Sequence, residues 1–274
     1  MAYASSKGAA LIDRALFLPE DWANDPARRQ KAGIPESVAF STKSELGQHM
    51  LARAFESGAP QGWVTGDEAY GKNGELRRWL ETQGRPFVFA VASNVSCGVA
   101  WGRVSDVLAE VSEPDWHRIS AGQGEKGPRW YDWARTTLNP NSPEPWRRWA
   151  LFRRRITDGQ IDFFLSAAPS DTSLEEMVRV AGMRWAIESC FEQAKGEVGL
   201  DQYEVRSWAG WHRHITLVMA ALAFLSVMRS KEASKKGDSI IEGRRGERMT
   251  TFKHARAQAE QQKKTHQVKP GASR

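Results

Sequence analysis

The chain is 274 residues long with 41% hydrophobic residues, which suits one large domain, or one domain with an insertion, around a sizeable core. Its two cysteines are too few for a disulfide framework. The net charge of +6 is concentrated at one end: residues 231–274 hold a surplus of seven positive charges and the rest sums to −1, which excludes a uniformly basic nucleic-acid-binding body.

Residues 1–92 alternate between helical and strand patterns. The predicted elements are a hairpin at 2–18, a surface connection at 19–40, a helix at 42–57, a strand at 63–65, a helix at 73–83 and a strand at 87–92. Thr42 and Glu45 are spaced as a capping box at the start of the first helix. The order helix, strand, helix, strand predicts βαβ units and a mostly parallel sheet.

Residues 93–168 have a different character, because Gly and Pro interrupt them and several tryptophans fall within them. Asp158-Gly159 separates two runs rich in β-forming residues, which is a strong hairpin signal. We interpret this segment as a β-rich insertion between two parts of an α/β core, residues 1–92 and 169–230.

The last part of the chain is helical and then basic. Ser173 begins a predicted helix that ends at about residue 196, and another runs from about 205 to 229. The apolar run at 215–228 is shorter than the ~18–20 residues of a membrane span, so we predict a buried core helix, no membrane contact and a cytoplasmic protein. Residues 231–274 are predicted to be disordered.

Two acidic residues stand where a metal site is expected. Asp67 follows an apolar strand, and ligands of open α/β sheets bind beyond the carboxyl ends of strands. Glu188 shares one face of its predicted helix with Arg184 and Lys195. The alternatives are a helix cap for Asp67 and an ordinary ion pair between Arg184 and Glu188, which leaves Lys195 without a role.

These residues belong to segments that resemble the DDE transposases of bacterial insertion sequences. The segments are Gly66–Gly71, Arg184–Glu188 and Phe191–Tyr203. The branch concerned has a β-rich insertion between its second Asp and its Glu, and a signature of Tyr, two residues, Arg, three residues, Glu, six residues, Lys. Arg184, Glu188 and Lys195 stand at these spacings, whereas Ala181 takes the place of the Tyr.

The resemblance implies an RNase H-like α/β core with a β-rich insertion, and a transposase that cuts and joins double-stranded DNA. Asp67 and Glu188 are then catalytic ligands of Mg²⁺ or Mn²⁺, hard cations that take oxygen ligands. A pair of such ions about 3.5–4 Å apart activates the attacking oxygen and stabilises the leaving one. Arg184, Lys195 and Tyr70 are expected to contact DNA, and a homodimer is a possible assembly.

A basic cluster and three tryptophans in residues 93–168 are further candidates for DNA contact. Arg153, Arg154 and Arg155 either bind DNA or form a solvated strand face. The tryptophans are Trp130, Trp133 and Trp146. We hypothesise that at least one of them stacks on a base extruded from a DNA end, and core packing is the alternative for each.

The first catalytic Asp of the resembled family lies on a strand that would precede the opening hairpin. We therefore expect a truncated, inactive transposase. Asp13 is the only acid of the hairpin, and its neighbour Arg14 offers it an ion pair, so it is a poor substitute. A non-catalytic remnant that binds transposon ends or multimerises with the full-length transposase, and an unrelated α/β nuclease, are the competing interpretations.

Overall fold

The computed structural model describes residues 1–5, 8–60, 62–98, 101–124, 126–138, 145–204 and 206–232. The chain divides into two compact units, Met1–Ala223 and Phe224–Arg274. The predicted disorder of the basic tail, residues 231–274, concerns residues that from position 233 onward lie outside the described part of the chain.

Among its described residues, the first unit contains ten strands, eight complete α-helices and the first part of a further helix that begins at Trp208. The strands are β1 (Ala2–Ser5), β2 (Gly8–Leu11), β3 (Val64–Gly66), β4 (Phe87–Val91), β5 (Ser96–Gly98), β6 (Gly102–Arg103), β7 (His117–Gly124), β8 (Gly127–Thr137), β9 (Trp146–Arg154) and β10 (Ile161–Pro169). The α-helices are α1 (Glu20–Ala23), α2 (Pro26–Ala32), α3 (Lys43–Glu56), α4 (Glu68–Gly71), α5 (Gly74–Thr82), α6 (Val104–Val107), α7 (Leu174–Gly182) and α8 (Arg184–Val198). Two short 3₁₀ helices, η1 (Leu108–Glu110) and η2 (Glu113–Asp115), follow α6.

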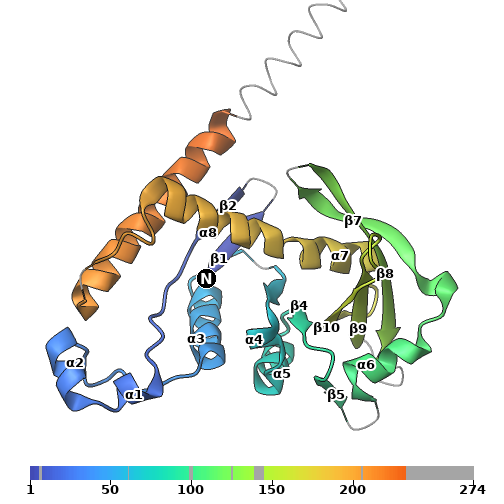
Figure 1. Cartoon of the computed structure of the whole chain (residues 1–274), viewed down its shortest axis with the longest axis horizontal. Helices are drawn as coiled ribbons and strands as arrows, with labels where there is room; N and C mark the ends of the chain where they lie inside the picture. The colour runs from blue at the N-terminus through green and yellow to red at the C-terminus, as the bar shows by residue number, and fades with distance from the viewer. Residues whose placement is uncertain are drawn as a thin grey trace, which may run out of the picture. The chain divides into compact units, whose positions relative to one another are not determined.

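Six strands form one mixed sheet in the order β3-β4-β10-β9-β8-β7 (Figure 1). Its β3–β4 pair is parallel, and the other four neighbouring pairs are antiparallel. The prediction of a mostly parallel sheet is therefore wrong. The strands β7–β10 of the predicted insertion extend the same sheet as β3 and β4, and the Asp158-Gly159 hairpin joins β9 to β10 as predicted.

The strand β4 lies inside the sheet and is buried along its whole length. Strands covered on both faces are apolar throughout, without polar alternation. Val88 and Ala90 pack in the core beneath α7, whereas Phe87, Phe89 and Val91 pack on the opposite face. The sheet is thus a middle layer between two helical layers.

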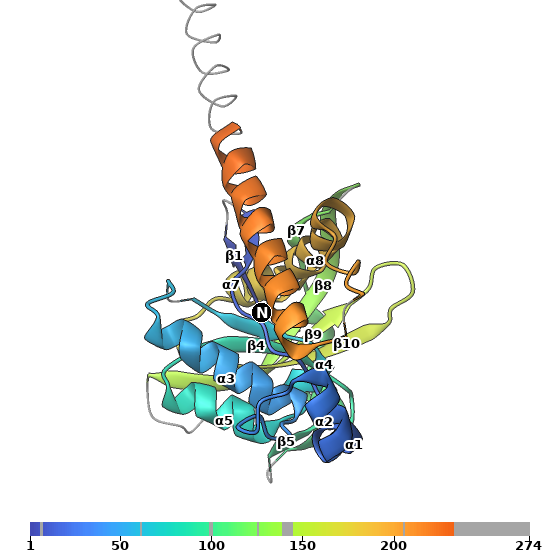
Figure 2. The ribbon, with the colours of Figure 1, turned by 90° about the vertical axis from the view of Figure 1, so that its left-hand side faces the viewer.

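The helices on this opposite face, α3, α5 and α6, attach through short apolar stripes. Leu76 and Leu80 of α5, four residues apart, are buried against Phe87 and Phe89. Figure 2 shows α3 and α5 side by side. The Thr42 capping box that begins α3 is formed as predicted.

The N-terminal segment contains more helix than the sequence led us to expect. The hairpin is limited to β1 and β2, and residues 16–18 are not a strand. The predicted surface connection contains α1 and α2. Asp25 accepts a hydrogen bond from the N–H of Arg28 at the start of α2, and Gly33 ends it in the left-handed region at φ 66°. These capping signals are present in the sequence and were missed.

The long helix predicted from Ser173 is interrupted at Met183, so that α7 and α8 are separate helices that follow each other along the molecule (Figure 1). A Cβ on Gly182 would lie 2.1 Å from the carbonyl oxygen of Ala121 in β7. Arg129 of β8 donates from Nη2 to the carbonyl oxygen of Gly182 at 3.0 Å. The end of α7 is therefore fixed against the sheet, and α8 continues beyond it.

A last helix spans Trp208–Glu232 and, by length and composition alone, could cross a membrane. Core helices of soluble proteins share this length and composition. Only 11% of its most apolar 18-residue window is buried, so the prediction of a buried core helix is wrong. Ile215, Val218 and Leu222 form its buried stripe, whereas Leu217 is 65% exposed.

The close approach at Gly182 yields a test of this architecture. Gly182→Ala should lower the free energy of unfolding by about 3 kcal/mol, the upper end for overpacking, because the atom that the new methyl group meets is backbone. Chemical denaturation followed by circular dichroism measures the change.

Gly196→Ala in α8 is the matched control, since a Cβ there meets nothing within 4 Å. It should raise the free energy of unfolding by about 0.5–1 kcal/mol, the usual gain from replacing a helical glycine. Equal stabilities for the two variants would contradict the packing of α7 against β7.

Candidate metal and nucleic-acid site

Asp67 and Glu188 line the same pocket, which we call the carboxylate pocket and which has a volume of about 410 Å³. Asp67 comes from the end of β3, and Glu188 from the first half of α8. The other lining residues belong to the N-terminus, α3, β3, α4, α5, β4 and α8. Two acids from distant parts of the sequence are thus brought to one cavity.

Asp67 is positioned by the tight turn from β3 into α4. Its Oδ1 accepts a hydrogen bond from the N–H of Ala69 at 3.0 Å, so it is the N-cap of α4. A Cβ on Gly71 would lie only 2.0 Å from the carbonyl oxygen of Ala90, which shows how closely α4 is pressed onto β4. The capping hydrogen bond is accepted by Oδ1, and Oδ2 has no hydrogen-bond partner among the described residues.

Tyr70 also lines the carboxylate pocket. Burial raises the pKa of its phenol, and the negative charge of Asp67 raises it further. Its ring edge is held near Gly47 of α3, where an added Cβ would lie 2.8 Å from the ring. Tyr70 is therefore a neutral hydroxyl beside the carboxylate at neutral pH.

Glu188 is paired on its own helix. Its Oε1 lies 3.2 Å from Nε of Arg184, and both side chains are about half exposed. Arg184 lines the carboxylate pocket as well. Lys195, two turns further along α8, is exposed and does not line it. The predicted trio therefore divides into an ion pair at the pocket and a separate cation on the surface.

Asp13 does not line the carboxylate pocket, and its side chain is occupied by other partners. Its Oδ2 lies 2.8 Å from Nη2 of Arg53 in α3, and its Oδ1 accepts a hydrogen bond from the N–H of Arg14 at 2.7 Å. The ion pair suggested with the side chain of Arg14 is replaced by one with Arg53. Within the described residues, no group of three or more His, Cys, Asp or Glu is placed to hold a metal ion.

The three arginines at the end of β9 each pair with an acid. In the order Arg153, Arg154, Arg155, their partners are Asp162 at 2.7 Å, Glu113 at 2.7 Å and Asp158 at 3.1 Å. Arg153 also lies over the ring of Tyr131, and Arg154 over that of Trp116. These pairs neutralise the cluster locally, and its contact with DNA stays a prediction.

The three candidate tryptophans differ in exposure. Trp133 is completely buried, so it cannot stack on a base, and the hypothesis is wrong for this residue. Trp146 is partly buried against the core that includes Phe87 and Phe89. Trp130 is 52% exposed on β8 and is the one that offers a free face for stacking.

Arg129 is a residue near the site that sequence reasoning missed. Its guanidinium lies 5.3 Å from the ring centre of Trp185, at the start of α8. Burial lowers the pKa of Arg129, while the negative charge of Glu188 raises it. No spacing rule links a residue of β8 to α8, so nothing in the sequence pattern could have shown this contact.

Residues 1–108 match a family model described as a DDE superfamily endonuclease. The match covers less than half of the chain and includes Asp67 and Tyr70 but not Glu188. It supports a relationship to DDE-type, transposase-like nucleases, which act on DNA and typically use divalent metals. Among curated proteins, no sequence matches this chain.

The two roles of Asp67, cap and candidate ligand, can be separated by substitution. Asn caps a helix as well as Asp does, whereas Ala does not. Asp67→Asn should therefore leave the free energy of unfolding nearly unchanged, and Asp67→Ala should lower it by about 1 kcal/mol in chemical denaturation.

Asp67→Asn also removes a charge that raises the pKa of Tyr70. Ultraviolet titration should show this phenol ionising at lower pH in the variant, with Tyr70→Phe used to identify its contribution. An unchanged titration would contradict the proximity of the two groups.

Proposed function

We propose that this chain carries the metal site of a transposase-type DNA nuclease of an insertion sequence, in which Asp67 and Glu188 bind a divalent cation, and that these two acids alone do not support strand transfer. The observation that carries the proposal is that these two acids line one pocket although 120 residues separate them. The endonuclease family match over residues 1–108 supports it from the sequence side.

The residues present suit a hard cation. A carboxylate at a strand end and a second one on a half-exposed helix face supply charged oxygen ligands, which Mg²⁺ and Mn²⁺ prefer. Such an ion would polarise a phosphodiester and lower the pKa of an attacking water. Mg²⁺ keeps several waters when it binds proteins, so one ion can be held by two carboxylates.

The surroundings of the carboxylates suit a phosphodiester. Arg184 stands beside Glu188 and can donate two parallel hydrogen bonds to a phosphate, and Lys195 adds a point charge further along α8. The neutral phenol of Tyr70 can donate a hydrogen bond to an oxygen near Asp67. The proposal places the chain on DNA in the cytoplasm.

A second candidate function is DNA binding without cleavage. It is favoured by the fact that both acids have conventional structural roles, Asp67 as a helix cap and Glu188 in an ion pair. The described residues also bring two acids, not three, to the carboxylate pocket. In that case the chain binds transposon ends or multimerises with an active transposase.

Direct metal binding tests the role of the two acids. Mn²⁺ titration followed by electron paramagnetic resonance should detect one weak site. Asp67→Asn and Glu188→Gln should each weaken it by about tenfold or more, since affinity for hard cations follows the number of charged oxygen ligands.

The matched control is Glu192→Gln, because Glu192 is exposed on α8, four residues after Glu188, and does not line the carboxylate pocket. This variant should bind Mn²⁺ as the unchanged chain does. If all three substitutions have the same effect, or Mn²⁺ does not bind, the proposed site is refuted.

A cleavage and strand-transfer assay tests whether these two acids suffice for catalysis. With two acids at the pocket, we expect the 274-residue chain to bind DNA bearing its transposon ends in Mg²⁺ or Mn²⁺ but not to join strands, because two carboxylates would supply too few charged oxygens to hold a pair of ions. Robust strand transfer that disappears in Asp67→Ala or Glu188→Ala would show that the chain is catalytically complete.

A further inference from the structure

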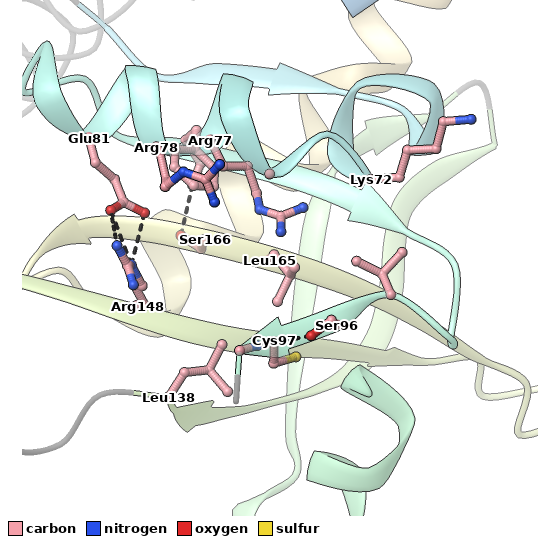
Figure 3. A pocket seen from close by; sticks show the side chains of 14 residues that line it. Lys72, Arg77, Arg78, Glu81, Ser96, Cys97, Leu138, Arg148, Leu165 and Ser166 are labelled. Atoms are coloured by element: carbon pink, nitrogen blue, oxygen red, sulfur yellow. Dashed lines mark hydrogen bonds and ion pairs between the residues drawn. The ribbon is translucent and has the colours of Figure 1, made fainter. Parts of the chain in front are cut away.

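A second cavity lies on the face of the sheet that carries α5 and α6, between α5 and β5 (Figure 3). We call it the cationic groove. Its volume is about 380 Å³, within the range of small-ligand sites. Phe87 and Leu165 contribute an apolar floor from β4 and β10, and Val95 and Leu138 contribute apolar walls.

Positive charge dominates the lining of the cationic groove. The ionisable side chains are four cations, one carboxylate and one thiol. The cations are Lys72, Arg77, Arg78 and Arg148, the carboxylate is that of Glu81, and the thiol is that of Cys97. Nε of Arg148 donates to Glu81 at 2.9 and 3.1 Å, so these two charges cancel. In the described part of the chain, Lys72, Arg77 and Arg78 form no ion pair with a carboxylate.

Two of these cations converge. A Cβ built on Gly74 would lie 3.6 Å from Nη1 of Arg78 and 3.7 Å from Nη2 of Arg77. Arg77 is anchored by a hydrogen bond from Nη1 to the carbonyl oxygen of Gly71. Figure 3 shows both guanidinium groups between α5 and the strand that carries Leu165.

The charges in the cationic groove act on one another. Burial lowers the pKa of Arg77, and the positive charges of Arg78 and Arg148 lower it further, against the raising effects of Cys97 and Glu81. Cations held together in a partly buried place repel one another, and a bound anion would relieve this repulsion. Guanidinium groups match the paired oxygens of a phosphate.

We propose that the cationic groove binds an organic phosphate, with Arg77 and Arg78 donating to the phosphate oxygens, Lys72 adding charge, and the apolar floor contacting the rest of the ligand. A free nucleotide and the backbone of single-stranded DNA both offer this chemistry. The inference is independent of the carboxylate pocket, because its test involves neither metal nor cleavage.

Calorimetric titration of the full chain with ATP, inorganic phosphate and a short single-stranded oligodeoxynucleotide tests the proposal. ATP or the oligonucleotide should bind, and Arg78→Glu should weaken that binding by about tenfold or more, as expected for loss of a charge-assisted contact. Arg78 is the residue to change, since Arg77 also holds Gly71.

Arg85→Glu is the matched control. Arg85 follows α5, lies 4.3 Å from the ring centre of Phe55 and does not line the cationic groove. This variant makes the same change in net charge and should leave the affinity unchanged. An equal loss in both variants would indicate long-range attraction only and would overturn the proposal.

Cys97 gives a local readout because it lines the cationic groove. Burial is the main cause that raises the pKa of its thiol to about 11, so its alkylation should be slow at neutral pH and accelerate as the pH rises. A bound ligand should protect Cys97 from alkylation at mildly alkaline pH, measured by mass spectrometry of its peptide. Cys190 is 2% exposed and serves as the internal reference.

The probes distinguish the source of the phosphate. Binding and protection by ATP support a free nucleotide, and binding and protection by the oligonucleotide alone support the DNA backbone. Binding of inorganic phosphate alone, failure of all three probes to bind, or binding without protection of Cys97 would overturn the proposal.

Discussion

The position of Glu188 depends on the close approach of two backbones, Gly182 at the end of α7 and Ala121 in β7. A hydrogen bond from Arg129 to the carbonyl oxygen of Gly182 reinforces this contact. The buried side of α7 holds it on the sheet, so the direction in which α8 leaves is fixed by the core beneath α7. The position of Glu188 in the carboxylate pocket therefore depends on packing beneath α7, on the face of the sheet opposite α5.

The helix α5 contributes residues to both the carboxylate pocket and the cationic groove. Leu76 lines the carboxylate pocket, whereas Arg77 and Arg78, the next residues, line the cationic groove. Consecutive residues of a helix point about 100° apart, so one short helix can present an apolar side to one cavity and charges to another. The anchoring of α5 by Leu76 and Leu80 therefore sets the geometry of both.

The sequence predicted local features well and long-range ones poorly. The Thr42 capping box, the Asp158-Gly159 hairpin and the strand before Asp67 depend on neighbouring residues, and all three are present. The antiparallel pairing of β10 with β4 and the break at Met183 depend on segments far apart in the chain. Spacing rules do not reach across such distances, so periodicity alone favoured a parallel sheet and one long helix.

For the candidate sites, too, the sequence predicted what local motifs carry and missed what depends on distant segments. The motif resemblance selected Asp67 and Glu188, and the structure places both at one pocket. The sequence did not predict the cationic groove, because Arg77 and Arg78 have the pattern of an ordinary solvated helix face. Only the fold brings residues of β5 and β10 next to them. The cluster at Arg153 attracted attention by its charge, yet its partner Asp162 lies on the facing strand.

The pairing of β4 with β10 has a consequence for synthesis of the chain on the ribosome. The strand β4 ends at Val91, and its neighbour β10 begins only at Ile161. Until that second strand emerges, one edge of β4 lacks its hydrogen-bonding partner, and the face that α7 later covers, with Val88 and Ala90, is open. The nascent chain therefore passes through a prolonged interval in which an apolar strand edge is open, a period when chaperone binding competes with aggregation.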